Sequence, residues 1–131
     1  MTDQKLIEYA KEGMKQAYAP YSGFRVGAAL LTRDGRIYLG CNVENASYGA
    51  TNCAERTAIF KAVSEGQREF EAIAVVCSEG TPAYPCGICL QVMSEFSPEI
   101  RIILEGEDGL KSYVLSDFLP NAFRLQQEKP L

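Results

Sequence analysis

The sequence has no histidine among its 131 residues. Histidine is the commonest metal ligand in proteins and the side chain whose ordinary pKa suits proton transfer near neutral pH. Its absence means that a transition-metal site in this chain would take its protein ligands from the five cysteines. The cysteines are therefore the first residues to consider for a functional site.

Two further absences concern location. No apolar run approaches the length of a membrane-spanning helix, and the N-terminus has no signal-peptide pattern. The sequence therefore predicts a cytoplasmic protein with no membrane partner. In that compartment the odd number of cysteines is expected to remain as reduced thiols.

A concentration of basic residues is also missing. The 13 Lys and Arg residues are outnumbered by 17 Asp and Glu, and they are scattered along the chain. A polynucleotide partner would need a basic surface for its phosphates, so we expect a small, nearly neutral substrate and no nucleic acid. What is present, 47% hydrophobic and 23% charged residues, is typical of one soluble globular domain spanning residues 1–131.

The hydrophobic pattern predicts alternating helices and strands. Helical spacing covers residues 3–18, and the almost continuous apolar run 24–31 predicts a strand buried on both faces. Asp34-Gly35 predicts a hairpin turn into a strand at 36–43. The remaining predicted elements are a helix capped by Thr51 or Asn52 and closed by Gly66, a strand at 73–77, a helix at 86–97, a strand at 100–104, a weak strand near Tyr113 and a short helix at 116–119.

This order of elements predicts an α/β fold. A hairpin followed by crossover connections gives a three-layer α-β-α sandwich, with a single mixed five-stranded sheet and helices on both faces. The two helices that begin near cysteines then start at one end of the sheet. The ligands on them would be brought together there.

Two short motifs carry the chemistry. Cys53 precedes Glu55 by two residues, and Cys86 and Cys89 form a CxxC pair after a proline. This pattern is close to the zinc-deaminase signature, in which three protein ligands hold Zn²⁺ and a carboxylate moves protons. Three thiolates leave the fourth position of the metal open, which is typical of a catalytic site, and Glu55 is predicted to act as general acid and base.

The alternative is a closed structural zinc site in which Cys41 or Cys77 supplies a fourth thiolate. That arrangement would leave Glu55 without a role. Arg56 is a candidate for hydrogen bonding to the sulfurs, because Zn²⁺ with three thiolates carries a net negative charge. Its alternative is an ordinary solvated arginine on a helix surface.

Asn42 and Glu44 are expected to project together from one face at the end of the strand at 36–43. Polar residues at strand ends are often simply solvated. Next to a zinc site, they instead favour binding of substrate hydroxyl groups.

Motifs along nearly the whole chain resemble the homotetrameric cytidine deaminases of the all-cysteine zinc class. They are Ala19-Pro20-Tyr21-Ser22, Phe24-Arg25-Val26-Gly27-Ala28-Ala29-Leu30, Gly40-Cys41-Asn42-Val43-Glu44-Asn45, Cys53-Ala54-Glu55-Arg56-Thr57-Ala58, Pro85-Cys86-Gly87-Ile88-Cys89 and Leu119-Pro120-Asn121-Ala122-Phe123. The resemblance implies a deaminase-type fold, one Zn²⁺ per subunit, and the hydrolytic deamination of cytidine and deoxycytidine to uridine and deoxyuridine in pyrimidine salvage.

The same resemblance implies how a nucleoside is held. Phe24 would pack against the nucleoside, and Asn42 and Glu44 would hold the ribose 3′-hydroxyl. Glu55 would hydrogen-bond the ring, whose carbonyl would accept from the backbone N–H of Ala54.

Two aromatic positions imply a composite site. Tyr48 and Phe123 match family positions that reach the pocket of a neighbouring subunit. The homotetramer would then be required for full activity. From its place in the sequence alone, Phe123 is more simply a locally packed aromatic residue.

One residue departs from the family pattern, which usually has arginine directly after the last cysteine. Here that residue is Leu90. The helix at 86–97 is predicted to bury Ile88, Val92, Met93 and Phe96, which places Leu90 off the apolar stripe. Leu90 would then fill a subunit contact or replace a charge near the thiolates.

Three other functions remain open at this point. One is a related zinc deaminase that acts on another amino-substituted base or a modified nucleoside such as blasticidin S. A polynucleotide editor and a zinc-stabilised nucleoside binder without catalytic activity are the others.

Overall fold

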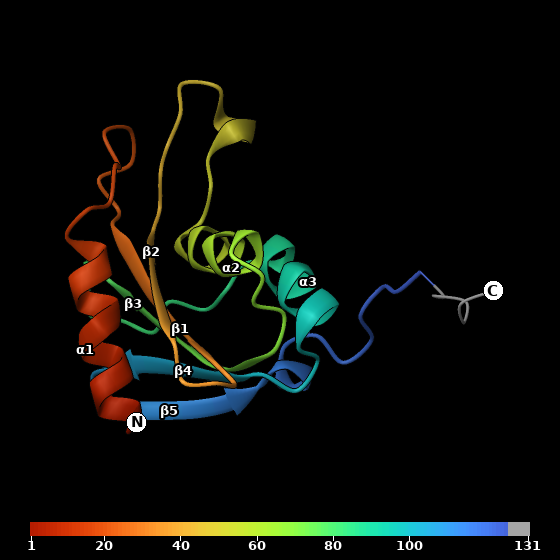
Figure 1. Cartoon of the computed structure of the whole chain (residues 1–131). Helices are drawn as coiled ribbons and strands as arrows, with labels where there is room; N and C mark the ends of the chain where they lie inside the picture. The colour runs from red at the N-terminus through yellow and green to blue at the C-terminus, as the bar shows by residue number, and fades with distance from the viewer. Residues whose placement is uncertain (126–131) are drawn as a thin grey trace.

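Five strands form one sheet in the spatial order β2-β1-β3-β4-β5. The structure is a computed structural model, described here for residues 1–125 (Figure 1). In chain order the elements are α1 (Asp3–Met14), β1 (Val26–Thr32), β2 (Ile37–Cys41), the one-turn 3₁₀ helix η1 (Tyr48–Ala50), α2 (Ala54–Ser64), β3 (Phe70–Cys77), α3 (Gly87–Phe96), β4 (Arg101–Gly106), β5 (Gly109–Val114) and the one-turn 3₁₀ helix η2 (Leu115–Asp117).

Helices cover both faces of the sheet, which confirms the predicted three-layer α/β fold with a mixed five-stranded sheet (Figure 1). On one face α1 packs through Leu6, Ile7 and Ala10. On the other face α2 and α3 pack through Ala58, Ile59 and Met93. Within residues 1–125, no helix is long and apolar enough to cross a membrane.

The strand directions bring the starts of α2 and α3 to one end of the sheet. Both β2 and β3 run antiparallel to β1, so they run in the same direction and end at the same edge. The helix α2 follows β2, and α3 follows β3 as the crossover to the parallel strand β4. The residues that begin these two helices therefore face the same region.

The first helix is shorter than predicted. It ends at Met14 rather than residue 18, because Tyr18 pairs with the segment after β2. The N–H of Tyr18 donates to the carbonyl of Asn42 over 2.9 Å, and the N–H of Glu44 donates to the carbonyl of Tyr18 over 2.8 Å. The loop between α1 and β1 is thereby held beside residues 42–44.

A glycine sets how closely β2 approaches α2. A Cβ atom on Gly40 would lie 2.2 Å from the carbonyl oxygen of Ala54 and 2.6 Å from the nitrogen of Ala58. Real Cβ contacts are never that short, so only glycine lets the first turn of α2 rest directly on β2. The N-cap of α2 is Cys53, rather than the Thr51 or Asn52 that the sequence suggested.

The buried face of α3 differs from the prediction. Ile88 is 61% exposed, whereas Leu90 is 6% exposed and belongs to the main core. The reason is the rotation of the helix: Cys89 and Met93, four residues apart, both face inward, which turns Leu90 inward and Ile88 outward. Leu90 is therefore a core residue of its own chain rather than an off-stripe position.

Candidate functional site

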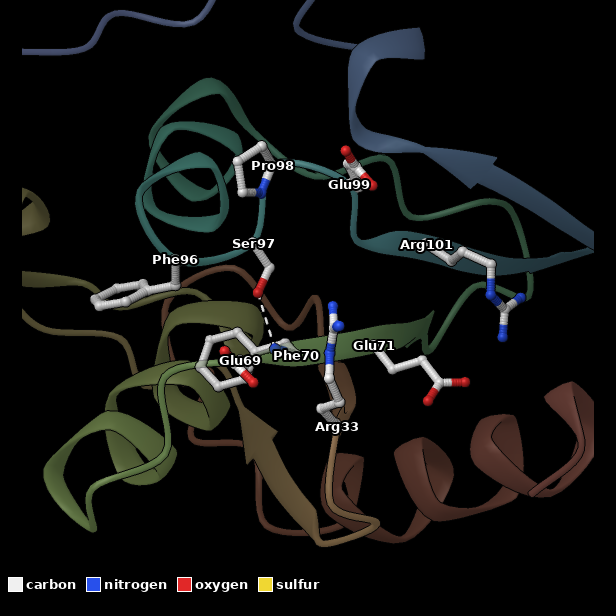
Figure 2. Close-up of a pocket in the computed structure, with 9 residues that line it drawn as sticks. All are labelled: Arg33, Glu69, Phe70, Glu71, Phe96, Ser97, Pro98, Glu99 and Arg101. Carbon is white, nitrogen blue, oxygen red and sulfur yellow. Dashed lines mark hydrogen bonds between the residues drawn. The ribbon is translucent and has the colours of Figure 1, made fainter.

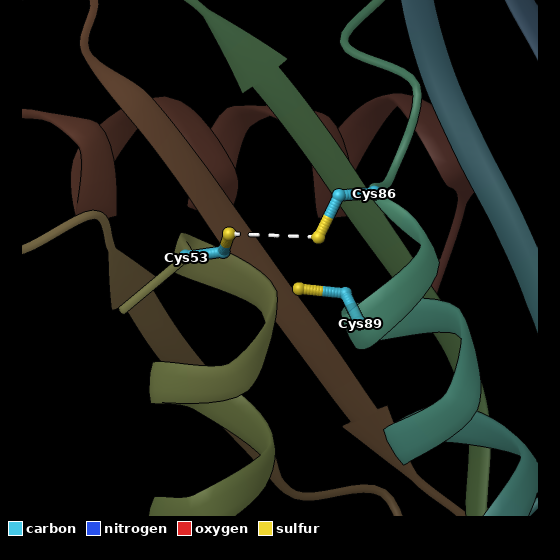
Figure 3. A group of neighbouring side chains, drawn as sticks. All are labelled: Cys53, Cys86 and Cys89. Carbon is cyan, nitrogen blue, oxygen red and sulfur yellow. Dashed lines mark hydrogen bonds between the residues drawn. The ribbon is translucent and has the colours of Figure 1, made fainter. Parts of the chain in front are cut away.

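Three thiols meet between the starts of α2 and α3. Cys53 is the N-cap of α2, Cys86 is the N-cap of α3, and Cys89 lies in the first turn of α3. Their sulfur atoms all lie within 4.8 Å of one another, and Figure 3 shows them converging on a common point. Cys89 is buried, while Cys86 is exposed to solvent.

The spacing of these sulfurs fits Zn²⁺. With Zn–S bonds of about 2.3 Å at tetrahedral angles, two ligand sulfurs lie about 3.8 Å apart. The sulfurs of Cys53 and Cys86 are 3.8 Å apart. Neither Cys41 nor Cys77 belongs to the group, so the four-cysteine alternative is not supported. Three soft thiolates with one open direction are the donor set of a catalytic zinc site.

Arg56 lies against the sulfurs as one turn of α2 brings it back over Cys53. Its Nε donates to the sulfur of Cys89 over 3.4 Å, and its Nη2 donates to the sulfur of Cys53 over 3.3 Å. A hydrogen bond with Cys89, together with Arg56, lowers the pKa of Cys53 to about 5, while the pKa of Cys89 is raised chiefly by its interaction with Cys53. The fork of the guanidinium thus favours a thiolate at Cys53.

Glu55 is buried beside this group without a cation of its own. Its side chain is 4% exposed, and burial raises its pKa to about 7. Its carboxylate is outside the three-sulfur group, and within residues 1–125 no lysine or arginine forms an ion pair with it. A buried carboxyl group with this environment can exchange protons near neutral pH.

The first turn of α2 also offers backbone donors. The Cys53 side chain makes no capping hydrogen bond, and the first amide in the helix to find a backbone acceptor is that of Thr57. Within residues 1–125 the N–H groups of Ala54 and Arg56 have no protein acceptor, whereas the N–H of Glu55 donates to the Glu55 carboxylate. The Asn52 amide steadies this turn by donating to the Thr57 hydroxyl over 3.1 Å.

Asn42 holds the start of β1. It is 7% exposed, its Oδ1 accepts from the N–H of Val26 over 2.9 Å, and its Nδ2 donates to the carbonyl of Phe24 over 2.8 Å. The bridge between Val43 and Asn52 lays this segment beside the chain that enters α2. Asn42 and Glu44 thus lie next to the cysteine end of α2, while the Phe24 ring stays 39% exposed.

The carboxylate of Glu44 accepts hydrogen bonds from the turn at Tyr21 and Ser22. Its Oε1 accepts from the N–H groups of both residues, over 2.9 and 3.1 Å, and its Oε2 accepts from the Ser22 hydroxyl. The hydroxyl bond is the largest cause of the lowered pKa of Glu44. A hollow of about 400 Å³ opens over the carboxylate, with Tyr48 and Thr51 among its lining residues. The place of Ser22 in this network carries no signal in the local sequence.

Tyr48 and Phe123 are both exposed to solvent. Tyr48 lies in η1 and is 77% exposed. Its ring is arranged edge-to-face with that of Tyr21, and the two ring centroids are 6.4 Å apart. Phe123 is 68% exposed, and only its carbonyl is held, by Gln91 over 2.8 Å. Figure 1 shows the loop that carries η1 and the C-terminal segment extending from different sides of the molecule. These two aromatics are not brought together within one chain.

A second hollow, of about 600 Å³, lies at the other end of α3 (Figure 2). Its lining includes Phe96 and Ser97, where α3 ends, together with Arg33, Glu69 and Arg101. It contains no thiol, and the Ser97 hydroxyl in its floor is occupied by the N–H of Phe70 over 2.8 Å. This hollow is separate from the site built around the cysteines.

Comparisons with known proteins show which family the chain resembles along most of its length. The family model described as "Cytidine and deoxycytidylate deaminase zinc-binding region" matches residues 1–105. The chain is 51% identical to the cytidine deaminase of Halalkalibacterium halodurans over 125 residues, which cover 94% of this chain and 95% of that protein.

A solved structure and a more distant relative complete the comparison. The crystal structure of cytidine deaminase from Burkholderia pseudomallei superposes with a TM-score of 0.89 at 52% identity, covering 94% of this chain and 100% of that one. The blasticidin-S deaminase of Bacillus cereus is 29% identical over 126 residues, which cover 90% of this chain and 89% of that protein.

Proposed function

The chain belongs to the family of cytidine and deoxycytidylate deaminases with a zinc-binding region, and from this premise we propose which of its residues carry out the reaction. The reaction is the hydrolytic deamination of cytidine and deoxycytidine, in which water replaces the amino group at C4 and ammonia leaves. The observation that carries this function is the convergence of three thiols beside a buried carboxyl group at the open start of α2.

Cys53, Cys86 and Cys89 would hold one Zn²⁺ per subunit. When bound, the metal supplies the Lewis acid that lowers the pKa of a water molecule toward neutrality. Arg56 would offset the negative charge that three thiolates place on the ion, because its guanidinium already reaches two of the sulfurs.

Glu55 would move the protons. Its position two residues after a ligand, and its burial without an ion pair to any of residues 1–125, let its carboxylate take a proton from water and return it to a ring nitrogen. A second transfer through Glu55 moves the proton of the hydroxyl group added at C4 to the amino group, which leaves as ammonia while the C4 carbonyl forms. The backbone N–H of Ala54 would donate to the ring carbonyl and fix the plane of the base.

Asn42 and Glu44 together suit a single hydroxyl group. A carboxylate has about four acceptor positions, and three of those on Glu44 are used by Tyr21 and Ser22. Asn42 has used one of its two amide protons on Phe24. One acceptor position on Glu44 and one amide proton on Asn42 remain, so a hydroxyl group can donate to the first and accept from the second. We assign this hydroxyl to the ribose 3′ position, with Phe24 against the nucleoside.

The related activity on a modified nucleoside such as blasticidin S is less well supported. The named blasticidin-S deaminase is 29% identical, whereas the cytidine deaminase of Halalkalibacterium halodurans is 51% identical over a similar length. A panel of amino-substituted nucleosides would show the preference directly. Cytidine and deoxycytidine are expected to be the best substrates in that panel.

The same proposal includes the extent of the domain, the assembly of the chain, its cellular role and its partners. Residues 1–131 would form one deaminase-type domain, supported by the single sheet that runs from β1 to β5. The chain would assemble as a homotetramer in which Tyr48 and Phe123 enter a neighbour's pocket, supported by their exposure. It would serve pyrimidine salvage in the cytoplasm, where free thiols stay reduced.

Neither a membrane nor a nucleic acid would be a partner. Titration of the protein with single-stranded nucleic acid at low salt tests the second of these expectations.

The test follows the loss of cytidine's ultraviolet absorbance with protein of known zinc content. Glu55→Gln is expected to bind zinc and fold normally while its turnover falls by several orders of magnitude, because the amide cannot accept the proton. Glu95→Gln, an exposed glutamate on α3, is the matched control and should keep full activity. Near-normal turnover by Glu55→Gln would remove the proposed acid–base residue.

A further inference from the structure

Ser22 lies between two residues of the proposed nucleoside site. Its hydroxyl donates to Oε2 of Glu44 and accepts the N–H of Phe24 over 3.0 Å. A hydroxyl has a single proton, and accepting from Phe24 leaves that proton directed at Glu44. The rotation of the hydroxyl is therefore fixed from both sides.

The hydrogen bonds from Tyr21 and Ser22 also fix the orientation of the Glu44 carboxylate. With Oε1 taken by the backbone of Tyr21 and Ser22, and Oε2 taken by the Ser22 hydroxyl, both carboxylate oxygens are anchored in one plane. The one acceptor position left over lies on Oε2, the oxygen that Ser22 holds. The direction of this free position depends on the serine hydroxyl rather than on Glu44 alone.

The anchoring crosses between two segments of the chain. Ser22 lies in the loop between α1 and β1, and Glu44 follows β2, so the bond joins two connections that leave the same end of the sheet (Figure 1). Glu44 is only partly buried and has no ion pair within residues 1–125 to hold it otherwise. Without the hydroxyl, Oε2 is free to turn toward water.

We propose that Ser22 is a positioning residue that aims the free acceptor position of Glu44 at the sugar hydroxyl of the nucleoside. This inference rests on the proposed function, since it assumes that Glu44 accepts a ribose hydroxyl. Ser22 acts through Glu44 and takes no part in the chemistry at C4. It determines how well the sugar is recognised, not how fast the amino group leaves.

The test compares two substrates that differ by one hydroxyl, cytidine and 3′-deoxycytidine. Ser22→Ala is expected to raise KM for cytidine about 10-fold with kcat nearly unchanged, because it weakens binding equally in the ground and transition states. With 3′-deoxycytidine the same substitution is expected to change KM less than twofold. Ser22→Thr keeps the hydroxyl and should restore the cytidine KM, and Ser116→Ala, an exposed serine in η2, is the matched control.

An equal rise of KM for both substrates would overturn the proposal, since it would mean that Ser22 only supports the backbone of the turn. An unchanged cytidine KM would also overturn it. The binding of uridine and of 3′-deoxyuridine, measured by calorimetry, gives the same comparison without turnover. If the wild-type chain bound uridine but failed to deaminate cytidine, the proposed function would fail while the role of Ser22 could still be measured.

Discussion

At the scale of single residues, the guanidinium of Arg56 is placed to offset the negative charge of the thiolates in the proposed zinc site. It donates to two sulfurs at once, which a lysine ammonium cannot do with the same planar fork. Three thiolates make the metal a weaker Lewis acid, and hydrogen bonds withdraw charge from the sulfurs. In the proposed zinc site Arg56 would thereby change the reactivity of the metal without being one of its ligands.

Replacing this residue tests the effect. Arg56→Gln is expected to lower kcat/KM for cytidine 10–100-fold, the usual effect of losing a hydrogen-bond partner of a metal ligand. The kcat/KM of Arg56→Lys is expected to lie between those of the wild type and Arg56→Gln. Activity is measured per bound zinc, so that metal loss is separated from rate. Arg36→Gln at the hairpin far from the sulfurs is the control, and an Arg56→Gln enzyme as fast as that control would contradict the role.

The cysteines divide into ligands and bystanders, and zinc content distinguishes them. Cys89→Ala is expected to bind well under one zinc per chain, because only two thiolates remain in the group. Cys41→Ala should retain one zinc per chain, because Cys41 is outside the group. Metal analysis of both purified variants checks this, and equal zinc in the two would refute the ligand assignment.

At the scale of elements, the close packing of β2 against α2 determines where Cys53 and Glu55, at the start of α2, lie. Because a methyl group on Gly40 would collide with the backbone of α2, Gly40→Ala is expected to push the start of that helix outward. The expected loss is about 1–3 kcal/mol in the free energy of unfolding, with weaker zinc binding. Gly49→Ala, where a Cβ atom meets nothing within 4 Å, is the control.

Denaturant unfolding and zinc analysis measure both effects. A Gly40→Ala protein with the stability and zinc content of Gly49→Ala would show that the contact between β2 and α2 does not position the cysteine.

The sequence predicted the architecture well because the strands and helices have strong hydrophobic periods. The two errors have different causes. The first helix stops at Met14 because Tyr18 pairs with Val43, a contact between distant positions that the local pattern cannot show. In α3, Cys89 and Met93 face inward and turn Leu90 inward with them, so the error lay in choosing Ile88 rather than Cys89 as part of the buried face.

The candidate site was only partly accessible to the same reasoning. The residues Cys53, Glu55, Cys86 and Cys89 form two recognisable motifs, so their chemistry could be predicted from residue type and spacing. Ser22 could not, because its bond to Glu44 joins positions that are 22 residues apart and depends on how two loops pack.

At the scale of the whole molecule, the proposed homotetramer would complete each pocket with Tyr48 and Phe123 of a neighbouring chain, both of which are exposed in the single chain. If Phe123 covers a neighbour's substrate, Phe123→Ala is expected to raise KM about 10-fold, the usual effect of losing an aromatic ring stacked on a base. Mixed assemblies of Phe123→Ala and Glu55→Gln chains should then regain activity at low cytidine. Some sites in them pair an intact Glu55 with a partner's intact Phe123.

The control for this experiment mixes Cys89→Ala with Glu55→Gln chains. Both of those changes damage a chain's own site, so no combination of subunits restores activity. Mixed assembly is verified by capture through a tag carried on only one chain. Verified mixing of Phe123→Ala and Glu55→Gln chains without recovery would mean that each site is built within one subunit.

The common direction of β2 and β3 has a consequence for how long the metal stays bound. The proposed ligands lie at the starts of two crossovers, α2 and α3, whose preceding strands both pair with β1, so a bound ion would cross-link two segments that could otherwise open separately. Opening the start of either helix breaks the site. The rate at which a chelator removes zinc therefore times the local opening of these two helix ends, and it would match the amide hydrogen exchange there rather than global unfolding.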